Sequence, residues 1–412
     1  MRIVHIITRL IIGGAQENTL ITCKLLAERG HDVTLITGPA LGPEGQLFDQ
    51  TRNQRYRTIV VKELRRAVDP VKDFVSYRRI KGLLEGLRPE IVHTHSAKAG
   101  ILGRRAAYHV RPRPKVVHAV HGLSFHPYQS PWLNHLYIAA ERRAARWTDA
   151  FVTVADAMTQ QSHAAGIGLD KPYVTAYSAI AEEGFYRDIP SPERLAFRQR
   201  VDVPADAVVL VTVARLFMLK GHDYIIASAP SLARQFPKAV WLFVGDGNLA
   251  DQYRRQIQDL GLADRFRFTG LLPPDQIPLA IQSSDVLVHC SLREGLARTL
   301  PQAMLCSRPA VSFDVDGARE VVNENTGRLI KPKDVEQLTA VCAELIADRP
   351  LRERLGQGGR RLVQDKFSPQ TMVDTIEQVY RRVIASQSPQ YLLVGAQPWP
   401  SVAQASRRPS SR

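Results

Sequence analysis

The chain has 412 residues, of which 44% are hydrophobic and 23% are charged. A chain of this length exceeds what one ordinary hydrophobic core supports, so we expect two domains. The hydrophobic content is high enough to exclude a mainly disordered or fibrous protein.

The charge is unevenly distributed along the chain. The 55 Lys and Arg residues outnumber the 40 Asp and Glu residues, which gives a formal net charge of +15. Residues 51–150 alone hold 20 Lys and Arg and 7 Asp and Glu, a local excess of +13. Such a segment suits an anionic membrane, a phosphate-bearing substrate, nucleic acid or a solvated basic surface.

The cysteines and the apolar runs indicate the cellular setting. No CxxC spacing occurs, which argues against a disulfide framework and a structural zinc site and predicts a reducing, cytoplasmic environment. The N-terminal apolar run is interrupted by polar residues and reads as a strand, not as a signal peptide. No run approaches the roughly 20 apolar residues of a membrane-spanning helix, so we expect any membrane contact to be peripheral. The cysteines are Cys23, Cys290, Cys306 and Cys342.

From the N-terminus onward, short apolar runs alternate with longer amphipathic stretches, the pattern of a parallel sheet covered by helices. Helices are predicted at Glu17–Glu28 and Pro70–Leu87. The predicted strands of the first half are Arg2–Ile7, Asp32–Thr37, Thr58–Val61, Ile91–Thr94, Lys115–Val120, Ala150–Val154 and Tyr173–Ala176.

The alternation pauses at Ser178–Val203, which is rich in charge and proline and has no strand signal, so we place the domain boundary there. The alternation then resumes, and a last amphipathic helix is predicted at Asp365–Ala385. The predicted strands of the second half are Val208–Val213, Val240–Val244, Phe266–Thr269, Val286–His289 and Ala310–Phe313.

The sequence therefore predicts an α/β protein with two consecutive β/α/β domains, residues 1–185 and 186–365. The helix at 366–385 is expected to pack back toward the N-terminal domain, and the Ser/Pro/Gln-rich residues 386–412 to form a disordered tail. Ligands of such sheets bind beyond the carboxyl ends of the strands. We therefore expect the site in a cleft between the two domains.

The first motif is the double glycine Gly13-Gly14, which follows the first strand and opens a helix. Without a β-carbon the backbone can approach a phosphate or sugar, and helix N-terminal amides favour anions. An ordinary strand-to-helix turn is the other interpretation. The spacing is not GxGxxG, so a nicotinamide dinucleotide site loses its main support.

Two histidine pairs follow in the sequences Val92-His93-Thr94-His95 and Val117-His118-Ala119-Val120-His121. His95 and His121 fall at the carboxyl ends of their strands, where a cleft would open. A single histidine is more often a satisfied polar residue than a catalyst. No i, i+4 pair or accompanying ligand set occurs, so no metal site is predicted.

The second half carries the stronger signal. Arg215 ends a strand and Lys220-Gly221 follows five residues later, which places two cations at the mouth of the sheet. Together they can neutralise a diphosphate, the Arg in forked fashion and the Lys as a point charge. The turn Gly245-Asp246-Gly247 comes after the next strand.

Cys290–Met304 follows another strand and enters a helix. Glu294 and Gln302 are eight residues apart, about two helical turns, so both face one side if the stretch between them is helical. Surface charge and helix capping would explain each motif alone, but the order of the motifs along the chain argues against coincidence.

The double-glycine loop, the strand ending in His121-Gly122, Arg215 with Lys220-Gly221, the glycine-flanked turn and the Glu294 to Gln302 element together resemble family 4 of the retaining glycosyltransferases. The resemblance covers about Met1 to Ala385. It implies the GT-B fold, in which two Rossmann-like β/α/β domains face each other across a cleft. The Arg-x4-Lys pair and the E-x7-E-like element are specific, whereas the two glycine motifs are not.

The resemblance implies a role for each matching residue. Arg215 and Lys220 would hold the donor diphosphate, and Glu294 would contact hydroxyls of the donor sugar. His121 would face the reacting sugar, with Gly13 and His95 on the acceptor side. The other residues that it implies in donor binding are Gly14, Gly245, Gly295, Leu296, Ala297 and Gln302. Gln302 departs from the family, which usually has a second Glu there, and an amide has one accepting oxygen, so the grip on the ribose must differ.

The expected activity is transfer of a sugar from a nucleoside-diphosphate sugar to a hydroxyl with retention of the anomeric configuration, in cell-surface polysaccharide, lipopolysaccharide or glycolipid synthesis. Because two fixed cations can stabilise the leaving diphosphate, neither a cofactor nor a metal is expected. The acceptor is expected to be a carbohydrate or a lipid-linked molecule. Residues 51–150 are expected to contact anionic lipid at the inner face of the cytoplasmic membrane. A solvated basic face is the other interpretation of that segment.

Three other functions remain open at this point, one of them a protein of the same fold that binds its ligand but no longer turns it over, for which Gln302 is the only hint. A sugar-nucleotide epimerase of the same fold would share the phosphate-binding residues but would need acid/base carboxylates and no acceptor. A nucleic-acid-binding protein is suggested by the basic charge alone, but the segment lacks interleaved aromatic residues and any zinc-finger or RNA-recognition signature, so no nucleic-acid partner is expected. The motifs do not specify the donor sugar, its base, the acceptor, the linkage or the oligomeric state.

Overall fold

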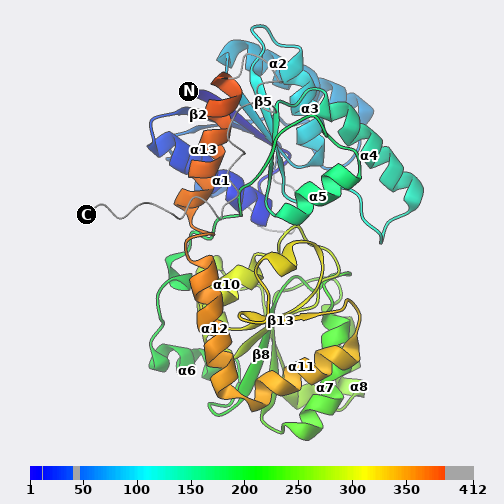
Figure 1. Ribbon diagram of the computed structural model, residues 1–412, viewed down its shortest axis with the longest axis vertical. Helices are drawn as coiled ribbons and strands as arrows, with labels where there is room; N and C mark the ends of the chain where they lie inside the picture. The colour runs from blue at the N-terminus through cyan, green and yellow to red at the C-terminus, as the bar shows by residue number, and fades with distance from the viewer. Residues whose placement is uncertain (12, 40–46, 386–412) are drawn as a thin grey trace. The chain divides into compact units, whose positions relative to one another are not determined.

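The computed structural model describes residues 1–11, 13–39 and 47–385, and the chain divides into two compact units (Figure 1). Unit 1 comprises Met1–Ala179 together with the segment from Ser368 onward, and unit 2 comprises Ile180–Phe367. The unit boundaries thus lie six residues before and two residues after the positions expected from the sequence. The tail predicted at 386–412 lies outside the described residues.

The described part of unit 1 is built on a seven-stranded sheet in the order β3-β2-β1-β4-β5-β6-β7. Every strand pair in it is parallel. The strands are β1 (Arg2–Ile7), β2 (Asp32–Thr37), β3 (Arg57–Val60), β4 (Ile91–His95), β5 (Lys115–Val120), β6 (Ala150–Thr153) and β7 (Tyr173–Thr175).

Helices cover both faces of this sheet (Figure 1). One face packs against α1 and α13 through one apolar cluster, and the other packs against α2 and α3 through a second cluster. This two-sided burial explains why the strands read as nearly continuous apolar runs. The helical segments of unit 1 are α1 (Gly14–Glu28), η1 (Phe48–Thr51), α2 (Pro70–Leu87), α3 (Ala97–Tyr108), α4 (Pro131–Ala145), α5 (Asp156–Ala164) and α13 (Pro369–Ala385).

The last helix, α13, belongs to unit 1 although it follows unit 2 in the sequence. Its buried face packs into the same cluster as α1 and β1. At its edge, Glu377 accepts hydrogen bonds from Arg29 at 2.9 Å and from His31 at 3.2 Å. The buried residues of α13 are Met372, Val373, Ile376, Val379, Tyr380 and Val383.

The described part of unit 2 contains a six-stranded sheet in the order β10-β9-β8-β11-β12-β13. All of its strand pairs are parallel. Its core includes Trp241, which stacks on Phe266 with ring centroids 5.0 Å apart. The strands are β8 (Val208–Val213), β9 (Ala239–Val244), β10 (Phe266–Gly270), β11 (Val286–His289), β12 (Ala310–Phe313) and β13 (Gly327–Ile330).

In unit 2 as well, helices lie on both sides of the sheet (Figure 1). Helices α7, α8 and α11 contribute to the apolar cluster that covers one face. The helical segments are η2 (Glu183–Phe185), α6 (Ser191–Arg200), α7 (His222–Gln235), α8 (Ala250–Asp259), η3 (Ala263–Arg265), η4 (Pro274–Gln276), α9 (Ile277–Gln282), α10 (Thr299–Leu305), η5 (Asp316–Glu320), α11 (Val335–Ala347) and α12 (Arg349–Val363).

Both sheets reverse their strand order at one point. In unit 1 the chain builds outward from β1 through β2 to β3 and then returns to place β4 on the other side of β1. Unit 2 repeats this with β8 and β11. The loops that leave the two strands at such a point diverge, which opens a binding position at the carboxyl ends.

The structure agrees with every predicted strand to within about one residue at each end and differs from the sequence prediction in four places. Helix α1 begins at Gly14, three residues before the predicted start at Glu17. The structure adds β13 (Gly327–Ile330), which has no apolar run. The last helix begins at Pro369, four residues later than predicted. The stretch between Glu294 and Gln302 is helical only from Thr299, so the helical premise for those two residues is wrong.

Among the residues that the structure describes, no helix is both long enough and apolar enough to span a bilayer.

The contacts of Glu377 predict how the docking of α13 depends on pH. Burial raises its pKa, but hydrogen bonds from Arg381, Arg29 and His31 outweigh burial and lower the pKa to about 2 from 4.5. A carboxylate with a lowered pKa stabilises the fold above its unfolded pKa and loses that contribution as the pH falls toward the folded value. We expect Glu377→Gln to lower the free energy of unfolding of unit 1 by about 2 kcal/mol at pH 7.

That loss corresponds to a fall in the Tm of unit 1 of roughly 4–8 °C, measurable by scanning calorimetry. The difference from the wild type should shrink between pH 4.5 and pH 2. Glu353→Gln is the matched control, because Glu353 pairs with Arg349 at 2.8 Å on an exposed surface and such exposed pairs contribute little to stability. Equal Tm changes for the two variants would contradict the assignment.

Candidate active site

In unit 2, an ion pair joins the loops that leave β8 and β11. Lys220 Nζ lies 2.5 Å from Glu294 Oε1, and their side chains are 24% and 22% exposed. The two residues are 74 positions apart in the chain. They meet because β8 and β11 are neighbours in the sheet and run in the same direction. Two residues predicted for donor binding are therefore brought together at the point where the strand order reverses.

Glu294 is held as a carboxylate from several sides. Burial opposes its ionisation, but the charge of Lys220 and the nearby His289 outweigh burial and keep the pKa of Glu294 well below its ordinary value. His289 Nε2 lies 3.6 Å from Glu294 Oε1. The backbone amide of Glu294 donates to Asp316 Oδ2 at 2.7 Å, which anchors the loop to the segment after β12. The sequence had not singled out His289 or Asp316.

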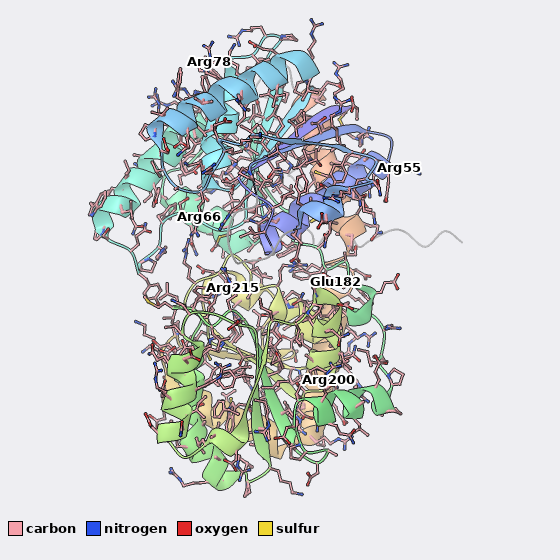
Figure 2. The ribbon with its side chains drawn as sticks, turned by 180° about the vertical axis from the view of Figure 1, so that it is seen from behind. Arg55, Arg66, Arg78, Glu182, Arg200 and Arg215 are labelled. Carbon is pink, nitrogen blue, oxygen red and sulfur yellow. The ribbon has the colours of Figure 1, made fainter. Side chains whose placement is uncertain are left out.

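Arg215 lies on the loop directly after β8 (Figure 2). It is exposed, and its guanidinium carbon lies 5.1 Å from the centre of the Phe217 ring. An exposed guanidinium beside an aromatic face is partly oriented by cation–π attraction and stays accessible to an anion.

The glycines of the unit 2 motifs hold these loops against one another. A β-carbon on Gly221 would overlap the carbonyl oxygen of Cys290. One on Gly245 would overlap the carbonyl oxygen of Ala214, and one on Gly247 that of Leu216. Gly221 and Gly245 also have positive φ angles of 77° and 140°, which residues with a β-carbon adopt at a cost. These glycines thus allow the close backbone packing that positions Lys220 and Arg215.

The element from Glu294 to Gln302 is a loop followed by a short helix. Gly295 accepts a hydrogen bond from the amide of Gly317 at 3.0 Å, and Leu296 and Ala297 are buried. Gln302 lies on α10 and is half-buried. Glu294 and Gln302 therefore do not share a helix face, and their positions are set by separate segments.

In unit 1, the predicted residues lie at the reversal between β1 and β4. Helix α1 begins at Gly14, and the carbonyl of Gly13 accepts from the amides of Gln16 and Glu17. The hydroxyls of Thr8 and Ser96 are 2.7 Å apart and tie the two strand ends together.

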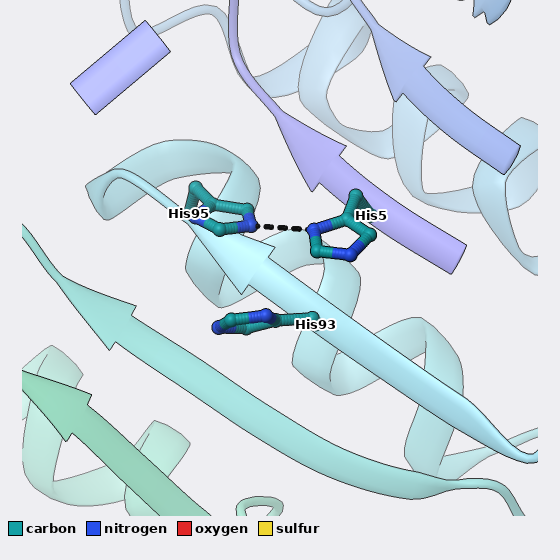
Figure 3. Close-up of side chains that lie close together, drawn as sticks. All are labelled: His5, His93 and His95. Carbon is teal, nitrogen blue, oxygen red and sulfur yellow. Dashed lines mark hydrogen bonds between the residues drawn. The ribbon is translucent and has the colours of Figure 1, made fainter. Parts of the chain in front are cut away.

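The sheet of unit 1 also carries a cluster of buried imidazoles (Figure 3). His5 on β1 and His93 on β4 are register partners, and His95 lies two residues further along β4. His5 Nδ1 and His95 Nε2 are 2.9 Å apart, and His95 Nδ1 and His121 Nε2 are 3.0 Å apart. The two predicted histidines, His95 and His121, are thus in direct contact.

These imidazoles are neutral. Burial lowers the pKa of His5 to about 3 and that of His121 to about 4. Burial, with repulsion between neighbouring rings, holds the pKa of His93 and of His95 well below the ordinary value. Each ring therefore has one N–H donor and one bare acceptor nitrogen.

His5, His93 and His95 form the one group of potential metal ligands found among the described residues, with ligand atoms within 4.8 Å of one another. The sequence prediction missed this cluster. A parallel register that aligns the histidine of β1 with the first histidine of β4 could have revealed it.

Two parallel α/β units, each with charged or polar residues at a reversal of strand order, are typical of the GT-B fold. The family model for glycosyl transferases group 1 matches residues 193–362, and the model for the glycosyl transferase 4-like domain matches residues 13–176. Together they cover most of the chain, which therefore belongs to this family of glycosyltransferases. The match favours a transferase over the epimerase alternative.

Individual proteins agree with this assignment. The chain is 26% identical over 388 residues to the UDP-Gal:alpha-D-GlcNAc-diphosphoundecaprenol alpha-1,3-galactosyltransferase of Escherichia coli, covering 92% of this chain and 96% of the relative. It is 31% identical over 271 residues to the 2-deoxystreptamine N-acetyl-D-glucosaminyltransferase of Streptomyces fradiae, covering 63% of each. The crystal structure of Anabaena Alr3699/HepE in complex with UDP has a TM-score of 0.78 at 20% identity, covering 93% of this chain and 100% of that one.

The packing of Gly221 predicts a large effect of a single methyl group. Gly221 and Gly261 have similar positive φ angles, 77° and 67°, but a β-carbon on Gly261 would meet nothing within 4 Å. We expect Gly261→Ala to cost about 1–2 kcal/mol from backbone strain alone. Gly221→Ala adds the overlap with Cys290, so its Tm should fall by several degrees more. Equal falls in Tm would show that the two loops are not tightly packed.

Proposed function

We propose that the protein transfers a sugar from a nucleoside-diphosphate sugar to a hydroxyl acceptor with retention of the anomeric configuration. The product would be a cell-surface polysaccharide, a lipopolysaccharide or a glycolipid. The observation that carries the proposal is the contact between Lys220 and Glu294 at the strand-order reversal of unit 2.

Binding of the donor to unit 2 would break this ion pair, and Lys220 and Glu294 would each contact the donor instead. Without ligand, Lys220 and Glu294 neutralise each other in a half-buried position. A bound diphosphate would attract Lys220 and Arg215, and Glu294 would accept from hydroxyls of the donor sugar. The amides of the segment Gly295–Ala297 and the turn at Gly245 would line the sugar and phosphates, and Gln302 would contact the ribose through its one amide oxygen.

The chemical step follows from the leaving group. The bond to the sugar breaks as negative charge grows on the diphosphate, and fixed cations stabilise that charge without having to reorganise. The departing phosphate oxygen would take the proton of the acceptor hydroxyl on the same face of the sugar, so no side-chain nucleophile and no metal is required. Unit 1 would supply His121 beside the reacting sugar and Gly13, Gly14 and His95 on the acceptor side.

The donor base and the acceptor are proposed from chemistry shared with relatives. The Escherichia coli relative is named for a UDP-sugar donor and a diphosphoundecaprenol-linked acceptor, and the Anabaena neighbour was solved with UDP. We infer a UDP-sugar donor, with a GDP-sugar as the alternative, and a lipid-linked acceptor. A turnover panel of UDP-glucose, UDP-galactose, GDP-mannose and ADP-glucose separates these donors.

A lipid-linked acceptor requires the enzyme to reach a membrane surface, and the start of α2 offers a suitable patch. Val71, Phe74 and Arg78 lie on one face of the helix by their i, i+3, i+7 spacing. Val71 is 73% and Phe74 63% exposed. Arg78 is exposed on α2, whereas Arg66 and Arg55 lie at other places on the surface of unit 1 (Figure 2). Exposed apolar and cationic side chains together suit an anionic lipid surface.

Removal of the Lys220 charge tests the donor site. We expect Lys220→Met to lower the rate of donor turnover by about a hundredfold, the usual effect of losing one preorganised group that stabilises transition-state charge. Lys238→Met is the matched control. Lys238 pairs with Asp206 in an exposed position at the amino end of β9, whereas Lys220 follows the carboxyl end of β8. Full turnover by Lys220→Met would exclude the proposed donor site.

Vesicle co-sedimentation tests the α2 patch. We expect the double variant Val71→Ser, Phe74→Ser to bind vesicles of mixed phosphatidylcholine and phosphatidylglycerol roughly thirtyfold more weakly, because burial of a Phe side chain contributes about 2 kcal/mol. Leu169→Ser is the control, since Leu169 is 66% exposed elsewhere on unit 1. Binding that ignores the phosphatidylglycerol content, or that falls equally in both variants, would exclude the patch.

A further inference from the structure

The histidines of unit 1 belong to a longer hydrogen-bonded chain that ends on α13. His93 Nδ1 lies 2.5 Å from the Tyr380 hydroxyl, which lies 3.4 Å from His5 Nε2. His5 then contacts His95, and His95 contacts His121. We call these five residues the imidazole chain. Its two end atoms, His93 Nε2 and His121 Nδ1, are buried and have no partner among the described residues.

The number of protons in the imidazole chain limits its states. Four neutral rings and one hydroxyl supply five protons, and the chain contains four hydrogen bonds, each of which uses one proton. One proton is therefore left over. When all four hydrogen bonds are made, this proton sits on His93 Nε2, on the Tyr380 hydroxyl, or on His121 Nδ1. Tyr380 is a candidate because its oxygen can accept from both neighbours.

These three positions differ in what can accept the spare proton. His93 and Tyr380 are both completely buried, and among the described residues neither has a further acceptor there. A buried donor without an acceptor is costly and rare. His121 follows the carboxyl end of β5, and the residue is partly exposed although Nδ1 itself is covered, so a substrate oxygen would reach Nδ1 by displacing the atoms that cover it. Only when the spare proton is on His121 Nδ1 can it be donated to an oxygen atom of a substrate beside β5. In the other two states the spare proton has no acceptor.

We propose that the imidazole chain fixes the tautomer of His121, so that His121 presents a neutral Nδ1–H donor to an oxygen atom of the substrate. This inference rests on the proposed function for the presence of that substrate. His121 is then the catalytic residue, and His95, His5 and Tyr380 are positioning residues that act through it. In this state each link donates toward His121, and His121 Nε2 accepts from His95 Nδ1–H.

A metal ion is a less suitable occupant of the same cluster. His5 Nδ1 and His95 Nε2 are already joined by a hydrogen bond, so one of them carries a proton and cannot offer a lone pair. The three clustered residues include no carboxylate or thiolate. A divalent ion would therefore carry its full charge into a buried site, at a large cost in free energy.

The tautomer can be observed directly in the full-length wild-type protein. Selective 15N labelling of histidine and assignment by the His121→Asn variant would give the ring nitrogen shifts of His121, which separate a protonated nitrogen from an unprotonated one. UDP-glucose and GDP-mannose are added in turn, and the one that turns over is used at saturation. We expect His121 Nδ1 to be protonated in that complex and Nε2 to be unprotonated. The opposite pattern, or a cationic ring, overturns the proposal.

A double-mutant cycle tests the link to activity. His95→Phe removes the donor to His121 Nε2, so we expect kcat to fall about tenfold and Nδ1 protonation to become incomplete. In His121→Asn the side-chain amide provides an N–H near the Nδ1 position without any tautomer, so adding His95→Phe should change kcat less than about twofold. The same tenfold loss in both backgrounds would show a merely structural role.

Two controls separate this inference from others. Thr94→Val removes a buried hydroxyl from the same strand, one that contacts His118 at 2.9 Å outside the imidazole chain, and it should leave the His121 tautomer and kcat unchanged. If Lys220→Met lowers turnover about a hundredfold while His95→Phe does not affect it, the proposed function stands and the inference fails. One equivalent of tightly bound zinc in the purified protein, with activity lost on chelation, also overturns it.

Discussion

The parallel direction of all paired strands is the constraint from which both sites follow. Because every strand pair in the described sheets is parallel, the carboxyl ends of the strands gather at one edge of each sheet. The order reversals between β1 and β4 and between β8 and β11 then place distant loops side by side. Lys220 meets Glu294 across 74 residues for this reason, and Thr8 meets Ser96 across 88. The glycines of unit 2 are needed because loops gathered at one edge must pack backbone against backbone.

The sequence reveals what depends on short-range pattern. Apolar runs locate the buried strands, and the Arg215, Lys220 and Glu294 motif locates the contact at β8 and β11, because both signals lie within a few residues. Strand β13 is not predicted from the sequence because Gly327 and Arg328 break its apolar pattern. Its place is set by pairing with β12. The shape of the loop before α10 could not be predicted from the sequence, because it depends on hydrogen bonds with Asp316 and Gly317. The role of Tyr380 depends on a helix that returns to unit 1 after the whole of unit 2.

The basic excess of residues 51–150 is a surface property and not part of either site. Most acidic side chains of this segment are matched by a cation from the same segment, such as Asp73 by Lys98 at 2.6 Å and Glu141 by the buried Arg104 at 2.6 Å. Internal pairs of this kind leave the segment's surplus on exposed side chains such as Arg66 and Arg78. Charges exposed to solvent are screened over about 8–10 Å at physiological salt. The surplus can therefore act only at short range, which is the range that the proposed contact between α2 and a membrane would need.

The two units differ in how they hold polar groups, and the proposed chemistry explains the difference. Unit 2 holds the charged pair of Lys220 and Glu294, which suits a diphosphate that becomes more negative as its bond to the sugar breaks. The sugar itself develops positive charge in an oxocarbenium-like transition state. A cationic imidazolium beside it would repel that charge, so a donor to the sugar should be neutral. Burial of the imidazole chain lowers the pKa of His121 and keeps it neutral. A neutral ring can carry its proton on either nitrogen, and the hydrogen bond from His95 to His121 Nε2 places that proton on Nδ1.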